Sequence, residues 1–264
     1  MSLNCYIINL DRAMDRWEQT SQKFQSLGFN VIRIPAVDGK DLQFPHPDFS
    51  PWHYFFYYGR PSIPNKVACY FSHIKALKLF LETNEEHVLI CEDDITPNPE
   101  VVDVINDAMK YADQWDMLRL CAIKPTRGVY FASLSHDYHL QSDLKTASGN
   151  GAKIVNRRAA ELIVEKCSRM KMPHDVTLFY EWPIGYREAS VAPFPIQLND
   201  HSNNSNIGQE PRYPKWHYTS LRYLVLWPHR ICSRTVRKIS RIYWAGKQKA
   251  VAGNSRKHSE KSQM

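Results

Sequence analysis

The feature that most constrains the fold is a short apolar run, residues 88–91, that stops at three consecutive carboxylates, Glu92, Asp93 and Asp94. Four buried-type residues in a row are typical of an interior strand of a parallel sheet. Such sheets bind ligands outside the carboxyl ends of their strands, so the acids are expected in a binding site. If the backbone stays extended, side-chain alternation places Glu92 and Asp94 on one face and Asp93 on the other.

Carboxylate oxygens at the end of this strand favour a metal site. They are hard ligands of the kind that bind Mg²⁺ or Mn²⁺ together with a phosphate group. The alternative is a helix N-cap at Asp94, since a helix is predicted at 100–111. A cap needs only one carboxylate, and this chain presents three, so the metal site is the favoured interpretation.

The N-terminal region predicts a β-α-β unit. Its expected elements are a strand at 5–10, a helix at 13–27 that ends at Gly28, and a second strand at 31–34. This arrangement is the architecture of nucleotide-binding folds, here without a glycine-rich phosphate loop. The chain has 264 residues, 43% of them hydrophobic, which is ample for one large α/β domain.

Polar residues at the carboxyl ends of these two strands are candidates for nucleotide binding. Arg12 and Arg16 lie four residues apart on one helix face, where two guanidinium groups can clamp a diphosphate. Ordinary surface pairing with neighbouring acids is the equally supported alternative. Asp38 precedes Gly39 after the second strand, so it is either a turn residue or a contact to a ribose or base.

No repeat or linker interrupts the chain up to residue 214, which favours a single domain there. Periodicity predicts further helices at 66–82 and 157–168, strands at 116–121, 152–155 and 195–198, and a hairpin over 128–139. The aromatic and proline-rich stretch 42–64 has neither helical nor strand period, so we expect an ordered excursion packed on the core. Within the first of these helices, His73 by itself predicts only a structural hydrogen bond.

The formal net charge of +7 comes from the C-terminal tail, because residues 221–264 hold 11 Lys and Arg against one acid. The high pI of 9.0 therefore says little about the globular part, and nucleic acid is not an expected partner. In the tail, basic residues alternate with aromatic and aliphatic ones, which predicts an amphipathic segment for an anionic membrane surface. We divide the chain into a domain at 1–220 and a basic tail at 221–264, whose end from residue 250 is expected to be disordered.

Cysteine usage and targeting signals favour a cytoplasmic protein. The six cysteines include no CxxC pair, and several fall in apolar strand-like runs, as expected of buried thiols in a reducing compartment. No secretory signal is apparent, and the longest apolar run of the tail, 223–227, is far below the ~20 residues of a spanning helix. The expected location is the cytoplasmic face of the inner membrane, with the tail as a peripheral anchor.

Four blocks of the sequence, in order, resemble glycosyltransferase family 25, the family of bacterial lipopolysaccharide and lipooligosaccharide galactosyltransferases. The blocks are Ile7 to Arg12 with Arg16, Pro35 to Gly39, Cys69 with Ser72 and His73, and Leu89 to Asp94. The resemblance extends over about residues 4–191. It implies a GT-A-type nucleotide-sugar-binding fold, with a mostly parallel central sheet flanked by helices. It also implies a UDP-sugar donor, Mn²⁺ or Mg²⁺, and an inverting transfer, most often of galactose, to a lipooligosaccharide or lipopolysaccharide acceptor.

The resemblance assigns roles to particular residues. The donor would be bound by Asn9, Asp11, Arg12, Arg16, Asp38, His73 and Asp93, with Gly149, Asn150 and Gly151 along the donor sugar. Metal ligands would be Glu92 and Asp94, with His201 as a third. An inverting transfer needs a base that deprotonates the acceptor hydroxyl, and Asp175 is the first choice, with Asp200 as the second.

Two other classes of function stay open. A metal-dependent phosphotransferase or phosphatase would share the acidic strand end, but it would not need the two arginines and the β-α-β unit. A non-catalytic membrane- or nucleic-acid-binding protein would explain the basic tail, but not the three acids. A glycoside hydrolase is disfavoured, because its two carboxyl groups must be spaced apart across the scissile bond.

Overall fold

The computed structural model describes residues 3–58, 61–124, 127–144, 149, 151–178 and 184–199, and in the tail only 235–236, 238–239, 242–243 and 246–247. Its main sheet contains β1 (Asn4–Asn9), β2 (Asn30–Pro35), β3 (His87–Glu92), β5 (Met117–Cys121), β6 (Gly128–Ser133), β7 (His139–Asp143), β8 (Ala152–Asn156) and β9 (Glu188–Ala192). A small second sheet pairs β4 (Ile95–Pro97) with β10 (Ile196–Leu198). The helices are α1 (Met14–Ser26), α2 (Pro51–Tyr58), α3 (Pro64–Leu81), α4 (Val101–Met109), α5 (Arg157–Cys167) and α6 (His174–Leu178).

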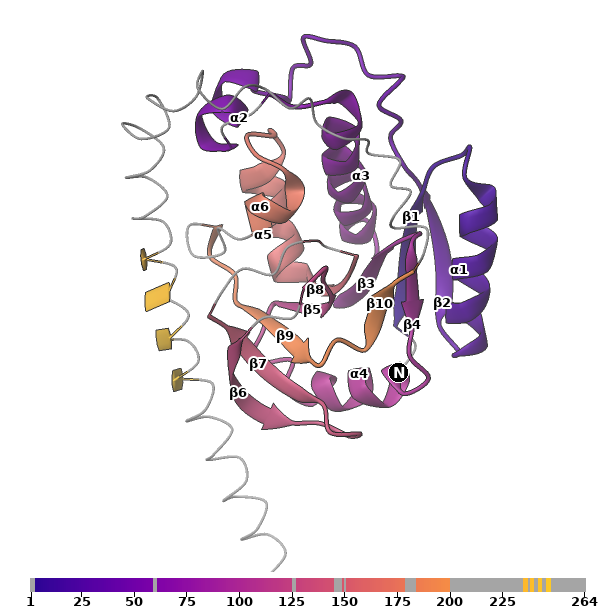
Figure 1. The fold of residues 1–264 in the computed structure, drawn as a ribbon, viewed down its shortest axis with the longest axis vertical. Helices are drawn as coiled ribbons and strands as arrows, with labels where there is room; N and C mark the ends of the chain where they lie inside the picture. Colours follow the sequence, from indigo (N-terminus) through magenta and orange to yellow (C-terminus); the bar gives the residue numbers. More distant parts are fainter. Residues whose placement is uncertain are drawn as a thin grey trace, which may run out of the picture.

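The main sheet has the strand order β2-β1-β3-β8-β5-β9-β7-β6 (Figure 1). Strand β1 pairs in parallel with β2 and β3, and β5 pairs in parallel with β9. Strand β8 runs antiparallel between β3 and β5, so the sheet is mixed. The carboxyl ends of β1, β2, β3 and β5 and the start of β8 therefore lie at one edge of the sheet.

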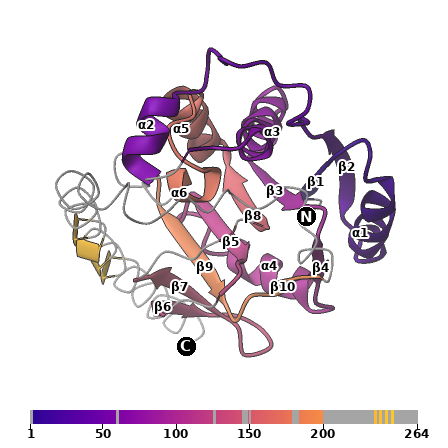
Figure 2. The same cartoon turned by 45° about the horizontal axis from the view of Figure 1, so that its top comes forward.

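Helices cover both faces of this sheet, as Figure 2 shows, and the alternation of buried side chains explains why. Cys5, Ile7, Leu89 and Cys91 pack with residues of α1 and α4 on one face. Tyr6, Ile8, Val88 and Ile90 pack with α3 and α5 on the other face. Because both faces of β1 and β3 are buried, their sequences are continuous apolar runs. The α/β class with a large sheet flanked by helices is confirmed.

Most predicted elements are present with small shifts at their ends. The stretch 42–64, expected to be irregular, is an exception because it contains α2. Pro51 occupies the first position of this helix, where a missing N–H costs nothing. Trp52 is exposed and Tyr54 is buried, so apolar residues occur on both the exposed and the buried side of the helix. Their spacing in the sequence therefore shows no helical period.

Five of the six cysteines lie in the described part of the chain, and all five are free thiols. Four of the cysteines, Cys5, Cys91, Cys121 and Cys167, are buried free thiols as predicted, and Cys69 is a partly buried free thiol. No helix within the described ranges is both long and apolar enough to span a bilayer. The division into a domain and a tail at residue 220 falls on residues outside the described part of the chain.

One buried carboxylate ties three parts of the fold together and supports a prediction about stability. Asp116 is 1% exposed and accepts hydrogen bonds from Asn156 Nδ2, Arg158 Nη1, and the backbone N, Nε and Nη2 of Arg187. Burial alone would raise its pKa, but the bonds from Arg187 and Asn156 lower it below its usual value.

We expect Asp116→Ala to lower the free energy of unfolding by about 2–4 kcal/mol, because it removes a buried acceptor and leaves several donors without it. Urea denaturation of the two proteins measures this loss. The matched control is Asp113→Ala, since Asp113 is exposed and the change should cost less than about 0.5 kcal/mol. An equally small loss in both variants would contradict the role given to Asp116.

Candidate donor and metal site

A cavity of about 110 Å³ opens at the sheet edge where β1, β2 and β3 end. Its walls come from these strand ends, from the start of α1 and from α3. They include Arg12, Arg16, Val37, Gly39, Cys69, Ser72, His73, Glu92, Asp93 and Asp94. The sequence places the candidate site at the carboxyl end of the strand 88–91, and the cavity opens at that point, since parallel strands bring their carboxyl ends together.

The three carboxylates all line this cavity, which corrects the expectation that Asp93 would point to the opposite face. The physical reason is that the extended conformation ends at Glu92, and Asp93 and Asp94 lie in a bend. Side-chain alternation applies only while the strand continues. At the last strand residue, the Glu92 N–H donates to the Gly151 carbonyl at 2.8 Å, which ties the acids to the start of β8.

Asp93 is held by two residues of the predicted donor site. Its Oδ2 accepts from Asn9 Nδ2 at 2.7 Å, and its Oδ1 lies 3.7 Å from Arg16 Nη1. Burial raises the pKa of Asp93, and Asn9 and Arg16 counteract this only in part. Thr20 Oγ1 also donates to the Asp93 backbone carbonyl at 2.9 Å, so both the carboxylate and the backbone of Asp93 are held by hydrogen bonds.

Asp94 has an oxygen that the protein does not satisfy. Its Oδ1 is buried and has no hydrogen-bond partner among the described residues. Burial, followed by the charges of Glu92 and Asp93, raises the pKa of Asp94 to about 7. A divalent cation would supply both the missing partner and the missing positive charge, so the residues fit Mg²⁺ or Mn²⁺. His201, the third predicted ligand, lies outside the described residues.

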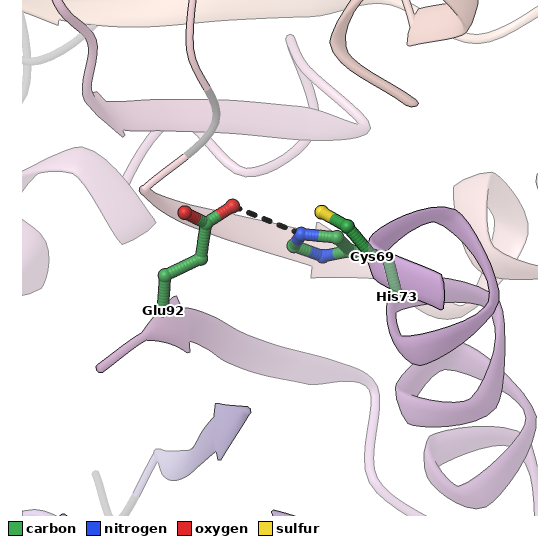
Figure 3. Close-up of side chains that lie close together, drawn as sticks. All are labelled: Cys69, His73 and Glu92. Atoms are coloured by element: carbon green, nitrogen blue, oxygen red, sulfur yellow. Dashed lines mark hydrogen bonds and ion pairs between the residues drawn. The ribbon is translucent and has the colours of Figure 1, made fainter. Parts of the chain in front are cut away.

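Cys69, His73 and Glu92 form a second group that could hold a metal, because one ligand atom of each lies within 4.8 Å of the others (Figure 3). Burial, together with nearby acids, raises the pKa of the Cys69 thiol far above its usual value. The thiolate is the form that binds metal ions, so this group is a poorer metal site than the oxygen ligands of Glu92 and Asp94.

The two arginines predicted to clamp a diphosphate both line the cavity. Arg12 forms an ion pair with Asp38, and Arg16 lies near Asp93, and both of these acids come from segments distant from α1 in the sequence. Asp11 is 78% exposed, pairs with Arg33 and is not among the cavity residues. Asp38 is not among the cavity residues either, but it pairs with Arg12 of the cavity wall, whereas Asp11 pairs with Arg33.

Of the glycines predicted to line the donor sugar, Gly151 lies beside Glu92, and neither Gly149 nor Gly151 is in the cavity wall. The carbonyl of Gly149 accepts from Arg119 Nη1 at 2.7 Å, and Gly149 has a φ of 87°, which favours glycine. Gly151 precedes β8, whose first residue pairs with Cys91 of β3. Asn150 and Asp200 lie outside the part of the chain that the structure describes.

Asp175 lies on α6, which packs against α3 next to the cavity. The ring of its neighbour His174 stacks on His73, with centroids 4.1 Å apart. Burial raises the pKa of Glu92, and the charge of Asp175 adds to this effect. Asp175 is not among the residues of the cavity wall. It is therefore placed beside the site, on the side of α3.

Sequence reasoning missed Lys153, which lies in β8 and is 1% exposed. Its Nζ lies 3.4 Å from His73 Nδ1, and burial lowers its pKa to about 7. A lysine between Ala152 and Ile154 suggests a strand with one solvated face. Because β8 is interior and covered on both faces, that position is buried. A lone lysine in an apolar interior strand was the available signal.

The raised pKa of Asp94 predicts a pH-dependent gain in stability when its charge is removed. A carboxyl group whose pKa is higher in the folded than in the unfolded protein stabilises the fold at low pH, and this contribution is lost as pH rises through the folded pKa. Asp94→Asn should match the wild type near about pH 4 and exceed its free energy of unfolding above about pH 7, by about 1–3 kcal/mol.

Urea denaturation in metal-free buffer across this pH range measures the gain. Asp103→Asn is the control, because it makes the same chemical change at an exposed residue outside the cavity wall. Identical pH profiles for Asp94→Asn and the wild type would mean that Asp94 is not held in an environment that disfavours its charge.

Comparisons with known proteins identify the family of the chain. A family model described as "Glycosyltransferase family 25 (LPS biosynthesis protein)" matches residues 2–177. Proteins named "Glycosyltransferase 25 family member" from Aedes aegypti and Anopheles gambiae are 32% and 30% identical over 122 residues. Each match covers 43% of this chain and 20% of the relative, so the chain spans only a small part of these relatives.

Two solved structures that match the chain share little sequence with it. A glycosyltransferase involved in glycosylation of the major capsid of PBCV-1 has 12% identity and a TM-score of 0.38, over 72% of this chain and 81% of that one. S. aureus TarS 1-349 in complex with UDP-GlcNAc has 12% identity and a TM-score of 0.35, over 85% of this chain and 65% of that one.

Proposed function

Since the chain belongs to glycosyltransferase family 25, we propose that it transfers a sugar from a UDP-sugar to a hydroxyl group of a lipooligosaccharide or lipopolysaccharide, with galactose as the expected sugar and a β-linkage as the product. The observation that carries this proposal is the cavity wall itself. Three carboxylates, one with an unsatisfied buried oxygen, face two arginines at the end of a β-α-β unit. Metal ligands and guanidinium groups together suit a nucleotide diphosphate.

The residues of the site divide between donor and metal. Arg12 and Arg16 would contact the diphosphate, and Asn9 would keep Asp93 in place for a donor contact. Glu92 and Asp94 would bind Mn²⁺ or Mg²⁺, and a bound ion would neutralise the negative charge that develops on the departing UDP. The roles of Asn150 and His201 stay predictions from sequence, as do those of Gly149 and Gly151 beside the sugar.

The acceptor hydroxyl must lose a proton as it attacks the anomeric carbon. We assign this proton to the carboxylate of Asp175, which lies on the α3 side of the site, with Asp200 as the second choice. A positioned base of this kind contributes typically ~10²–10⁴-fold to the rate. The attack forms the new glycosidic bond on the face opposite the departing UDP, so the configuration at the anomeric carbon inverts.

The proposal is tested with a panel of UDP-sugars, with and without EDTA, by measuring UDP release and then transfer to a truncated lipooligosaccharide. Metal-dependent release of UDP from one sugar donor, followed by transfer, is the expected result. Release of phosphate from a simple phosphomonoester, with no turnover of any UDP-sugar, would instead favour the phosphatase alternative. The three acids are compatible with that chemistry, but the two arginines in the cavity wall favour a diphosphate.

We further propose that the basic tail, residues 221–264, binds the anionic cytoplasmic surface of the inner membrane. The support is its sequence, with 11 Lys and Arg interleaved with aromatic and aliphatic residues. Each basic residue near an anionic surface contributes about 1 kcal/mol, so engagement of part of the tail is sufficient for binding. Deletion of 221–264 should abolish sedimentation with anionic liposomes while UDP-sugar hydrolysis survives.

The control for this deletion is removal of 250–264 alone, which leaves the interleaved segment intact and should leave liposome binding nearly unchanged. Full liposome binding by the protein without 221–264 would contradict the membrane proposal. Loss of folding in that protein would show that part of the tail belongs to the folded domain.

A further inference from the structure

Three side chains from three elements form a hydrogen-bonded chain at the wall of the cavity. Lys153 Nζ of β8 lies 3.4 Å from His73 Nδ1 of α3, and His73 Nε2 lies 3.1 Å from Glu92 Oε1 at the end of β3. Lys153 and His73 are 1% and 2% exposed, so water does not compete for these contacts. Figure 3 shows the imidazole of His73 facing one oxygen of Glu92, with the other oxygen directed away from it.

The chemistry of the three groups determines which of them donate. In its protonated form the Lys153 amine has only donors, so it donates to His73 Nδ1, which then carries a lone pair. A neutral imidazole has one N–H, and it is therefore on Nε2, where it donates to Glu92. The other tautomer would place two acceptors, Nε2 and a carboxylate oxygen, against each other.

The surroundings keep His73 neutral and its ring in one orientation. Burial lowers the pKa of His73 well below its usual value, and the charge of Lys153 adds to this effect. The ring of His174 stacks on that of His73, with centroids 4.1 Å apart and planes inclined by 8°. The imidazole thus keeps its Nε2–H directed at Glu92.

We propose that Lys153 is a positioning residue that acts through His73 to hold the Glu92 carboxylate, so that one oxygen is engaged and the other faces the cavity. This inference rests on the proposed function, because it gives Glu92 its orientation for a metal ion or donor. It also disfavours a soft-metal site at Cys69, His73 and Glu92, since the Nε2 that such a metal would need carries a proton in this arrangement. Loss of a residue that holds a metal ligand in place typically lowers metal affinity or activity by ~10–100-fold.

Three variants separate positioning from simple filling of space. Lys153→Met keeps the length of the side chain and removes its donors, and replacement of a buried charge by an apolar residue of similar size is usually tolerated. Lys153→Gln keeps an N–H donor without the charge. Lys166→Met is the control, because Lys166 also donates to a neighbour, the Ile184 carbonyl, but lies on α5 away from the cavity wall.

The first measurement is the tautomer of His73 in the metal-free protein, read from long-range ¹H–¹⁵N correlation spectra of the histidine rings, with the signals assigned through His73→Gln. We expect the Nε2–H tautomer in all four proteins, because Glu92 still accepts from Nε2 in each of them, and a shifted Nδ1 resonance in Lys153→Met, where Nδ1 loses its donor. Lys153→Gln keeps an N–H donor and should shift this resonance less, and Lys166→Met should leave it unchanged. An Nδ1–H tautomer in the wild type, or an unchanged Nδ1 resonance in Lys153→Met, would overturn the proposal.

The second measurement is Mn²⁺ binding to the same four proteins by titration followed by electron paramagnetic resonance. We expect the dissociation constant to rise by about 10–100-fold in Lys153→Met and by less in Lys153→Gln. Wild-type affinity in Lys153→Met would contradict positioning of Glu92. If the wild type itself bound no Mn²⁺ and no UDP-sugar while showing the expected tautomers, the proposed function would fail and the hydrogen-bonded chain would stand.

Discussion

Asp94→Asn is expected to lower metal-dependent turnover of a UDP-sugar by about 10²–10⁴-fold, equivalent to about 3–5 kcal/mol of transition-state stabilisation, while the protein stays folded. The buried Oδ1 of Asp94 has no partner among the described residues, so a metal ion is the partner that this geometry calls for. An amide keeps the size and shape of the side chain but removes the negative charge that a divalent ion needs. The loss should therefore appear in Mn²⁺ affinity and in kcat together.

Turnover is measured as UDP release over a range of Mn²⁺ concentrations, and folding is checked by thermal unfolding in the same buffer. Asp103→Asn serves as the control, because it makes the same chemical change at an exposed residue of α4. Turnover close to that of the wild type in Asp94→Asn would refute the metal assignment. Without added metal near neutral pH, Asp94→Asn is expected to be at least as stable as the wild type, so unfolding curves recorded under that condition separate loss of activity from loss of folding.

The second large effect is expected for Asp175→Asn, which should lower kcat for transfer by about 10²–10⁴-fold with little change in affinity for the UDP-sugar. The amide keeps the shape of the side chain and cannot accept the proton of the acceptor hydroxyl. Donor affinity should survive, because Asp175 lies on α6 beside the cavity and is not part of its wall.

Single-turnover transfer and equilibrium binding of the UDP-sugar separate the two quantities. Asp48→Asn is the control, since Asp48 is exposed and is not part of the cavity wall. Loss of donor binding in Asp175→Asn would place this residue in the donor pocket. An undiminished kcat would exclude it as the base and leave Asp200 as the residue to test.

The sequence by itself determined the parts of this protein that depend on local patterns. Apolar runs predicted the strands β1, β2 and β3, and three- and four-residue spacing predicted α1, α3, α4 and α5 close to their observed bounds. The position of the acids after an apolar run was enough to predict a site at a strand end. Arg12 and Arg16 follow β1 by the same logic, and both do line the cavity with Glu92 to Asp94.

Only the tertiary structure decided the features that depend on which segments meet. The pairing of β8 between β3 and β5, antiparallel to both, cannot be read from its own five residues, because an apolar strand fits either direction. This pairing buries Lys153 and brings it to His73, 80 residues away along the chain. The bend after Glu92, which turns Asp93 into the cavity, is likewise set by contacts from Asn9 and Thr20. Such contacts join residues far apart in sequence, and local periodicity carries no information about them.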